Sequence, residues 1–157
     1  DYLGYLEEAY FMRQVSKFDY SYRKQIANDR KPYICDNGFI SALSARPMTD
    51  RGWLLENLVF NALEPQGEVY YWADGGKECD FLLVRNRQVK AAVQVAWELN
   101  SKNREGELEG LVNAMKAHRL KRGILLTYDT QEEILADGKK ISVMPAWKWL
   151  ITNAGFP

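Results

Sequence analysis

Apolar residues recur at helical spacing in four stretches of the chain, at 2–14, 52–63, 101–117 and 146–151. The second stretch carries a double i, i+4 stripe, which predicts a helix that is buried on that face. The third repeats apolar residues at i, i+3, i+4 and i+7 within an otherwise polar segment. Candidate N-caps precede these two helices at Thr49, Asp50, Asn100 and Ser101.

Segments rich in β-branched and aromatic residues separate these predicted helices, which favours strands. They cover residues 69–73, 81–84, 90–96, 123–128 and 141–145. Turn sequences join them, ADGGKE between the first two strands and Asp137-Gly138 before the last. The order of helices and strands predicts an α/β fold with a mixed central sheet flanked by helices.

The first forty residues contain a different pattern. Residues 17–23, KFDYSYR, alternate aromatic and polar side chains, which predicts a strand with one aromatic face. Residues 33–35 are its expected partner strand, and residues 36–38, Asp-Asn-Gly, are expected to turn the chain. The two strands would form a hairpin.

Composition then narrows the class of protein. The chain has 157 residues, a formal net charge of zero and 46% hydrophobic residues, which is typical of one ordinary globular domain. Only two cysteines, Cys35 and Cys79, and one histidine occur, so neither a zinc site nor a disulfide framework is expected. No apolar run reaches the length of a membrane span. We therefore expect a soluble, cytoplasmic protein without a membrane partner. Because Asp1 already stands in a predicted helix, we also expect that the chain is part of a longer polypeptide.

Two common active-site classes find no support in the sequence. The nearest match to a P-loop, Gly-Gly-Lys at 75–77, has Glu78 where Ser or Thr is required and Tyr71 where the first glycine belongs. Nor is there a nucleophile elbow to accompany a hydrolase triad. The single histidine, His118, is expected to be a solvated residue near the end of a helix.

The informative side chains are acidic. Glu78 and Asp80 are two residues apart at the start of a strand, so they leave the same face. If the two strands pair as a hairpin, Asp80 also approaches Gln94. Carboxylate and amide oxygens are ligands suited to Mg²⁺, which activates water for phosphodiester hydrolysis. The alternative is that these side chains only solvate the entrance of a strand.

A family resemblance runs through nearly the whole chain. The segments that carry it are, in order, YLGYLEEAY, GWLLENLVFNAL, KECDFLLV, VQVAWEL, NREGELEGL, GILLT and ISVMPAWKWL. Their order and spacing resemble the C-terminal domain of unknown function attached to many prokaryotic AAA+ ATPases. That domain is similar to the PD-(D/E)XK restriction-endonuclease-like fold.

The resemblance implies a domain organisation and a partner. Residues 1–48 would hold the last helix and wing of a winged helix, followed by a linker, and residues 49–157 would form the endonuclease-like core. The partner would be an AAA+ ATPase module upstream in the same polypeptide, through which the chain could also oligomerise. DNA is the further partner that the resemblance suggests.

The resemblance also implies site residues. Glu56 matches the acidic residue of the first core helix, and Asp80 matches the first metal-binding carboxylate. Gln94 stands where the second carboxylate belongs, and Ala96 stands at the lysine position. Glu56, Asp80 and Gln94 are thus the candidate catalytic and Mg²⁺-binding residues of a degenerate site. Glu56 is alternatively an exposed helix residue, because it lies roughly 200° around the helix from Leu54.

Basic residues elsewhere in the sequence differ in whether they can replace the absent lysine. Lys90 is six residues away, roughly 20 Å along a strand, which excludes it. Lys102 or Arg104, at the start of the next helix, could reach inward.

Local basic character between residues 13 and 31 suggests a nucleic-acid contact. Its candidate residues are Arg13, Lys17, Arg23 and Lys24, followed by Arg30 and Lys31. Interleaved aromatic residues fit a wing that follows phosphates. The alternative is a solvated hairpin rim. A second basic group, residues 118–122, is expected to complement a helix dipole.

Three functional hypotheses follow. The first is a catalytically degenerate endonuclease-like domain of an AAA+ ATPase that binds nucleic acid or a partner. The second is a working Mg²⁺-dependent DNA endonuclease with a displaced basic residue. The third is a protein interaction module that uses exposed aromatic residues such as Trp147 and Trp149.

Overall fold

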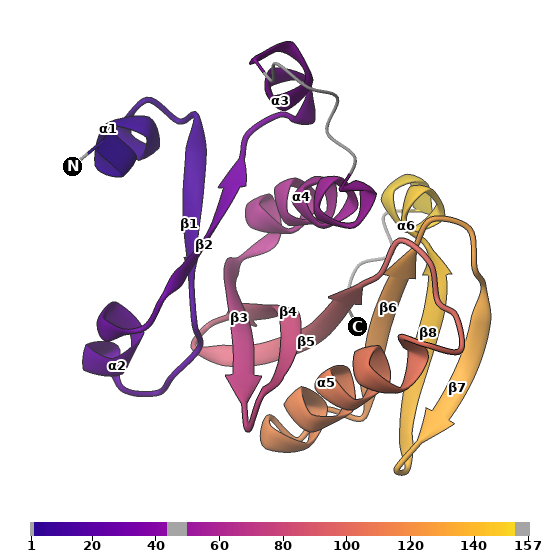
Figure 1. Ribbon diagram of the computed structural model, residues 1–157. Helices are drawn as coiled ribbons and strands as arrows, with labels where there is room; N and C mark the ends of the chain where they lie inside the picture. Colours follow the sequence, from indigo (N-terminus) through magenta and orange to yellow (C-terminus); the bar gives the residue numbers. More distant parts are fainter. Residues whose placement is uncertain (1, 44–49, 153–157) are drawn as a thin grey trace.

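A six-stranded mixed sheet organises the computed structural model, which describes residues 2–43 and 50–152 (Figure 1). The strand order is β3-β4-β5-β6-β8-β7. The strands are β3 (Glu68–Asp74), β4 (Lys77–Arg85), β5 (Gln88–Val95), β6 (Arg122–Thr127), β7 (Glu132–Ala136) and β8 (Lys139–Pro145). Strands β3 to β5 are antiparallel neighbours, β6 runs parallel to both β5 and β8, and β7 is antiparallel to β8.

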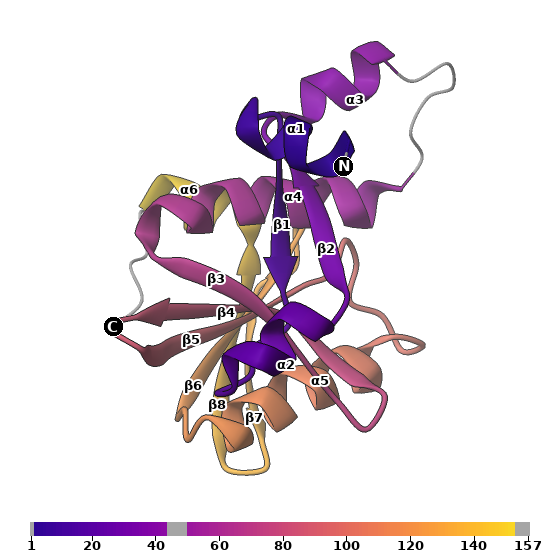
Figure 2. The same ribbon diagram turned by 90° about the vertical axis from the view of Figure 1, so that its left-hand side faces the viewer.

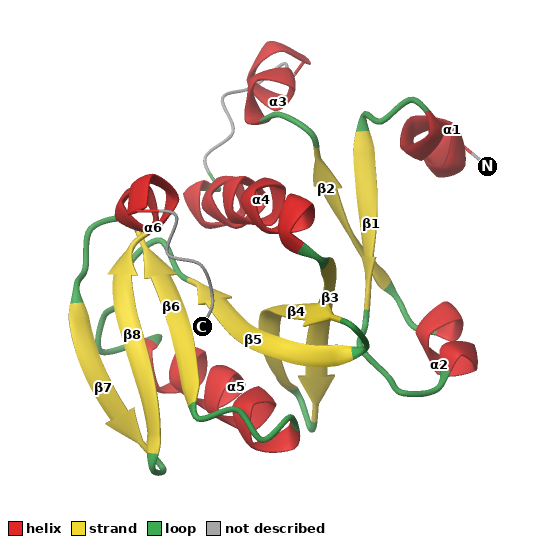
Figure 3. Cartoon of the chain, turned by 180° about the vertical axis from the view of Figure 1, so that it is seen from behind, coloured by secondary structure: helices red, strands yellow, loops and turns green. Residues whose placement is uncertain are grey.

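Helices cover both faces of this sheet, as Figure 3 shows from behind. Helix α4 (Arg51–Leu63) and helix α6 (Ala146–Thr152) lie on one face, and α5 (Arg104–Ala117) lies on the other. Successive residues of β4 point to opposite faces, so Phe81 joins the core under α4, whereas Leu82 joins the core under α5. The predicted α/β architecture with a mixed, helix-flanked sheet is therefore confirmed.

Helix starts follow the local capping chemistry. The Asp50 carboxylate accepts the Trp53 N–H at 2.9 Å, so Asp50 caps α4; the rival cap, Thr49, lies outside the described residues. Helix α5 begins later than predicted, with Asn103 at its N-cap. The reason is that the Asn100 side chain accepts the N–H of Lys102, which closes a turn before the helix.

One strand of the sheet has no counterpart in the sequence analysis. Strand β7 is the edge strand, and its sequence EEILA lacks a clean alternation of polar and apolar residues. The predicted turn between it and β8 is confirmed, since Asp137 and Gly138 both have positive φ, at 48° and 71°. Glutamates on this exposed edge oppose pairing with another strand.

The N-terminal segment differs most from its prediction. It contains α1 (Tyr2–Glu8), β1 (Met12–Ser16), α2 (Tyr22–Ala27), β2 (Arg30–Ile34) and α3 (Asn37–Leu43). Outside this segment, a short 3-10 helix, η1 (Glu64–Gln66), follows α4. Strands β1 and β2 form an antiparallel pair.

The strand predicted at 17–23 is therefore wrong, as is the helix predicted to continue to residue 14. Tyr20 and Tyr22 are 83% and 75% exposed, so the aromatic alternation faces water, whereas Met12 and Val15 supply the buried positions of the actual strand. The predicted turn at 36–38 is instead the start of α3, where Asp36 accepts the Gly38 N–H.

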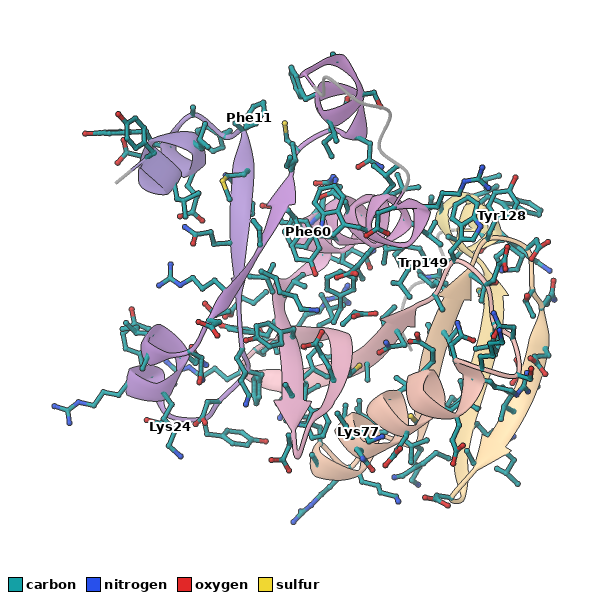
Figure 4. All side chains as sticks on the ribbon, viewed as in Figure 1. Phe11, Lys24, Phe60, Lys77, Tyr128 and Trp149 are labelled. Carbon is teal, nitrogen blue, oxygen red and sulfur yellow. The ribbon has the colours of Figure 1, made fainter. Side chains whose placement is uncertain are left out.

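Strand β2 is fixed against α4. The Tyr33 ring is buried and stacks on Phe60, which is labelled in Figure 4, at 4.5 Å between centroids. The Asn57 side chain accepts the Ile34 N–H and donates to the Ile34 carbonyl oxygen, at 2.7 and 2.8 Å. The β1–β2 pair thus crosses beside β3 as an added layer (Figure 2).

Among the described helices, none is long and apolar enough to cross a membrane.

Candidate functional site

Side chains replace backbone hydrogen bonds where β4 and β5 diverge. Phe81 and Val93 form the last backbone pair of this ladder. Beyond it, the Asp80 N–H donates to Gln94 Oε1 at 3.2 Å, and Asp80 Oδ2 accepts the Val95 N–H at 2.9 Å. Asp80 and Gln94 are both buried. The prediction that these two side chains approach each other is confirmed.

A lysine from the β1–β2 hairpin, Lys31, lies beside Asp80. Lys31 Nζ lies 3.6 Å from Asp80 Oδ1 and 3.7 Å from Glu56 Oε1, and it also donates a hydrogen bond to Glu78 Oε1. The ammonium group therefore stands among three carboxylates from α4 and β4. We name Lys31, Glu56, Glu78 and Asp80 the Lys31 cluster.

The pleat of β2 explains how the lysine arrives there. Lys31 and Tyr33 are two residues apart, so both side chains leave the same face of the strand. The Tyr33 hydroxyl donates to Glu56 Oε1, and the Lys31 ammonium reaches the same oxygen. Glu56 is thus held by two donors from β2, and its interpretation as an exposed helix residue is wrong, since its side chain is only 19% exposed.

Burial and mutual repulsion set the protonation of the cluster. Burial, followed by the nearby Glu56 carboxylate, raises the pKa of Asp80 to about 8, although Lys31 and the Val95 N–H oppose the rise. Burial lowers the pKa of Lys31, but attraction to Asp80, Glu78 and Glu56 outweighs it and leaves that pKa above its ordinary value. The lysine is therefore charged at neutral pH.

Helix α5 contributes a further carboxylate. Glu107 Oε2 accepts a hydrogen bond from Gln94 Nε2 at 2.7 Å. Burial raises the pKa of Glu107, Glu56 adds to the rise, and the Gln94 amide partly offsets it. Gln94 thus uses both ends of its amide within the protein, the oxygen toward Asp80 and the nitrogen toward Glu107.

As placed, these residues do not fit a Mg²⁺ ion. The Gln94 oxygen accepts the Asp80 N–H, one Asp80 oxygen accepts the Val95 N–H, and the other oxygen faces the Lys31 ammonium. Within residues 2–43 and 50–152, no three Asp, Glu, His or Cys side chains are arranged to share a metal ion. A protein cation takes the position that a metal would need.

An acidic cleft of about 490 Å³ opens beside the cluster. Ala96 lies in its wall, where the resemblance places a lysine, and no Lys or Arg is found among the described residues that line it. Its carboxylates are Asp50, Glu56, Glu98 and Glu107. Such a cleft repels phosphate groups unless cations enter with them.

The other basic candidates do not reach the site. Arg104 forms a two-point ion pair with Glu132, at 2.7 and 2.9 Å, so it points away from the cleft. Lys90 donates to Gln88 at 2.6 Å, and Lys102 is exposed and does not line the cleft, so the expectation that it reaches inward is wrong. The lysine that does reach the carboxylates is Lys31, which the sequence suggested only as a nucleic-acid contact. The K-x-Y spacing of Lys31 and Tyr33 on one strand is the signal that could have found it.

The predicted nucleic-acid residues divide into two groups. Arg13 pairs with Glu64, with 2.9 Å between Nε and Oε1, and contacts backbone carbonyls besides. Lys17 is half-buried, whereas Arg23 and Lys24 are exposed on α2, and Lys24 projects outward in Figure 4. Of this set, only the two residues of α2 are exposed, and Lys24 Nζ lies 4.0 Å from Asp19 Oδ2.

Two aromatic-ring predictions are corrected. His118 is half-buried rather than solvated, because its ring packs edge-on against Phe18 at 4.9 Å between centroids. Burial lowers its pKa. Trp149 is buried in the core beside α4, so of the two tryptophans proposed for partner contact only Trp147 is exposed.

Comparison with known proteins adds one relative. No protein-family model matches the chain, and no solved structure matches it. Over 163 aligned residues, which cover 97% of this chain, it is 32% identical to an uncharacterized protein of Methanocaldococcus jannaschii. The chain spans 36% of the length of that relative.

Proposed function

We propose that this chain is a catalytically degenerate, endonuclease-like domain of an AAA+ ATPase, and that it binds nucleic acid or a partner rather than cutting DNA. The observation that carries the proposal is the Lys31 ammonium group among Glu56, Glu78 and Asp80. An internal cation neutralises part of this acidic cluster. The residues are then stable together without a metal ion, and the chemistry that needs the metal is lost.

Three further features support the proposal that the catalytic activity is lost. Gln94 supplies no second negative charge, Ala96 supplies no amine, and the cleft beside them is acidic. Removing one positioned acid, base or charge-stabilising group typically lowers a rate on the order of 10²–10⁴-fold. Two such losses act on the same step, so we expect no measurable cleavage.

The AAA+ context rests on the family resemblance of the chain. The archaeal relative is long enough to hold another module, because this chain spans 36% of it. A G-x-x-x-x-G-K-[ST] segment after a predicted strand in the unmatched part of the relative would support an attached ATPase. A relative without such a segment would count against this part of the proposal.

The cleavage test compares three proteins with single- and double-stranded DNA in Mg²⁺ and in Mn²⁺. These are the parent chain, Asp80→Ala, and the double variant Gln94→Glu with Ala96→Lys. We expect no cleavage by the parent or by Asp80→Ala. Robust cleavage by the parent that disappears in Asp80→Ala would overturn the degenerate assignment. Activity gained by the double variant would show that the two substituted positions are what the parent lacks.

The position of Lys31 favours one rival function, a working endonuclease in which this lysine replaces the missing one. Its amine lies within 3.7 Å of two candidate carboxylates, although it comes from a different strand than the resemblance implies. This rival requires that the parent cleave DNA and that Lys31→Met abolish the activity, while Lys90→Met, on an exposed strand residue, leaves it unchanged.

A further inference from the structure

Two basic segments that are far apart in the sequence meet on one surface. The His118 ring, at the end of α5, lies 4.9 Å from the Phe18 ring and 6.3 Å from the Tyr20 ring, between centroids. Tyr20 stands two residues before α2, next to the N-cap Ser21. In Figure 2, α2 and the C-terminal end of α5 accordingly lie on the same side of the molecule.

The two segments carry an excess of basic residues although the chain as a whole is neutral, and of these Lys116 is paired with Asp137 at 2.6 Å and Lys24 lies 4.0 Å from Asp19. Residues 116–122 hold four basic residues and no acidic one, and residues 17–30 hold four basic residues and two acidic ones. Their exposed basic residues are Arg23, Lys24, Arg30, Arg119, Lys121 and Arg122. We name these residues, with Tyr20 and Tyr22, the α2–α5 surface.

Two aromatic rings stand open on this surface. Tyr20 is 83% exposed and Tyr22 is 75% exposed. The Tyr20 ring is supported from behind, because Phe18 packs against it edge-on at 5.2 Å and His118 lies beyond. Since burial lowers the pKa of His118, this imidazole is neutral at physiological pH and acts as packing rather than charge. The Tyr20 ring is therefore supported before any ligand arrives.

We propose that the α2–α5 surface binds a single-stranded nucleic acid. Its arginine and lysine side chains contact phosphates, and unpaired bases stack on Tyr20 and Tyr22. Paired bases offer no free faces to exposed rings, so the tyrosines favour a single strand over a duplex. This deepens the proposed binding function, on which it rests, and places binding away from the acidic cleft beside the Lys31 cluster.

The experiment measures the fluorescence anisotropy of a labelled oligodeoxythymidylate of about 16 nucleotides, a typical site size. A duplex of equal length and vesicles of anionic phospholipid are the competing ligands. Variants remove the two tyrosines together (Tyr20→Ala with Tyr22→Ala) or the basic residues of α5 (Arg119→Ala with Lys121→Ala). A matched control removes two exposed lysines elsewhere, Lys90 and Lys102.

We expect the parent to prefer the single strand. The tyrosine variant should weaken binding at least about fivefold, the loss typical of one stacked base. The basic variant should reduce the salt slope by roughly 0.7 for each lost phosphate contact. The control should change Kd less than about twofold, and the far-ultraviolet circular dichroism of all variants should match the parent, since these side chains are exposed.

Several results would overturn the proposal. They are an absence of oligonucleotide binding at low salt, an equal loss in the Lys90 and Lys102 control, a duplex preference that ignores the tyrosines, or binding to vesicles alone. Failure here is separable from failure of the proposed function. DNA cleavage by the parent refutes the degenerate site but not the binding surface. A protein that neither cleaves DNA nor binds the oligonucleotide refutes the binding surface and leaves partner binding as the proposed function.

Discussion

The Lys31 ammonium group offsets the repulsion among three carboxylates that the chain folds together. The side chains of Asp80, Glu56 and Glu78 are 9%, 19% and 45% exposed, so water screens the first two weakly. Without the lysine, Glu56 and Glu78 would lose the cation that they share, and the pKa of Asp80, already raised to about 8, would rise further. The cluster therefore makes a testable contribution to stability.

Lys31→Met should destabilise the fold by about 1–3 kcal/mol, because it removes the cation and keeps most of the apolar stem. Urea unfolding at neutral pH measures the change. Lys90→Met, at an exposed position, should change stability by less than about 0.5 kcal/mol. Adding Glu56→Gln to Lys31→Met should recover part of the loss, because it removes a carboxylate that Lys31 faces at 3.7 Å. If the effects of the two substitutions only add, the cluster is not an electrostatic unit.

The single histidine, His118, makes the folding stability depend on pH. Burial lowers the pKa of His118 in the folded chain below its ordinary value, against the rings of Phe18 and Tyr20. Between the two pKa values the unfolded chain binds more protons than the folded chain. Folding stability must therefore fall as the pH falls through this window, which begins near pH 6.5 and extends below it.

We expect this term to vanish in His118→Phe, which keeps an aromatic ring but cannot titrate. Urea midpoints taken from about pH 7.5 to about pH 5.5 should fall more steeply for the parent than for the variant. Parallel curves for the two proteins would show that the imidazole titrates equally in the folded and unfolded chains.

At the scale of elements, close approach of α5 to β4 brings Glu107 beside Gln94. Gly110 permits this approach, because a Cβ atom there would lie 1.9 Å from the carbonyl oxygen of Glu78. No side chain can be accommodated at that distance without a shift of the helix. The contact between a helix and a strand backbone thus positions one carboxylate of the candidate site.

Gly110→Ala should destabilise the protein by about 1–3 kcal/mol despite the higher helix propensity of alanine. Gly106→Ala is the matched control on the same helix, because nothing lies within 4 Å of its added Cβ. It should stabilise by about 0.5–1 kcal/mol. Thermal unfolding of both variants checks the pair, and equal effects would mean that α5 does not press on β4.

At the scale of the whole molecule, the N-terminal segment is unevenly attached. Helices α1 and α2 contain no buried residue, whereas Val15 of β1 and Tyr33 of β2 belong to the core beneath α4. The hairpin strands should therefore share the stability of the main sheet, and the two short helices should open locally.

Amide hydrogen exchange over residues 2–24 should be faster than over residues 81–96. The difference should be largest in α1 and α2, at least about tenfold, and smallest in β1, where Val15 is buried. Mass spectrometry of peptides after timed exchange resolves these segments. Equal protection throughout would mean that α1 and α2 belong to the main core.

The sequence by itself determined the elements that have a local signature. The i, i+4 stripe of 52–63, the apolar runs of the inner strands and the Asp137-Gly138 turn each reflect a conformation that a few neighbouring residues prefer. It also placed Asp80 near Gln94, since a hairpin register follows from the length of its turn. It failed at 17–23, where the aromatic alternation faces water, and at β7, where polar and apolar residues do not alternate cleanly.

Only the tertiary structure decided the composition of the candidate site. Lys31 reaches Asp80 because Tyr33 and Asn57 fix β2 against α4, a packing choice that no local pattern encodes. The same holds for the meeting of Tyr20 with His118, which are separated by nearly a hundred residues. Contacts of this range depend on which faces exclude water together, and that is a property of the assembled core rather than of any segment.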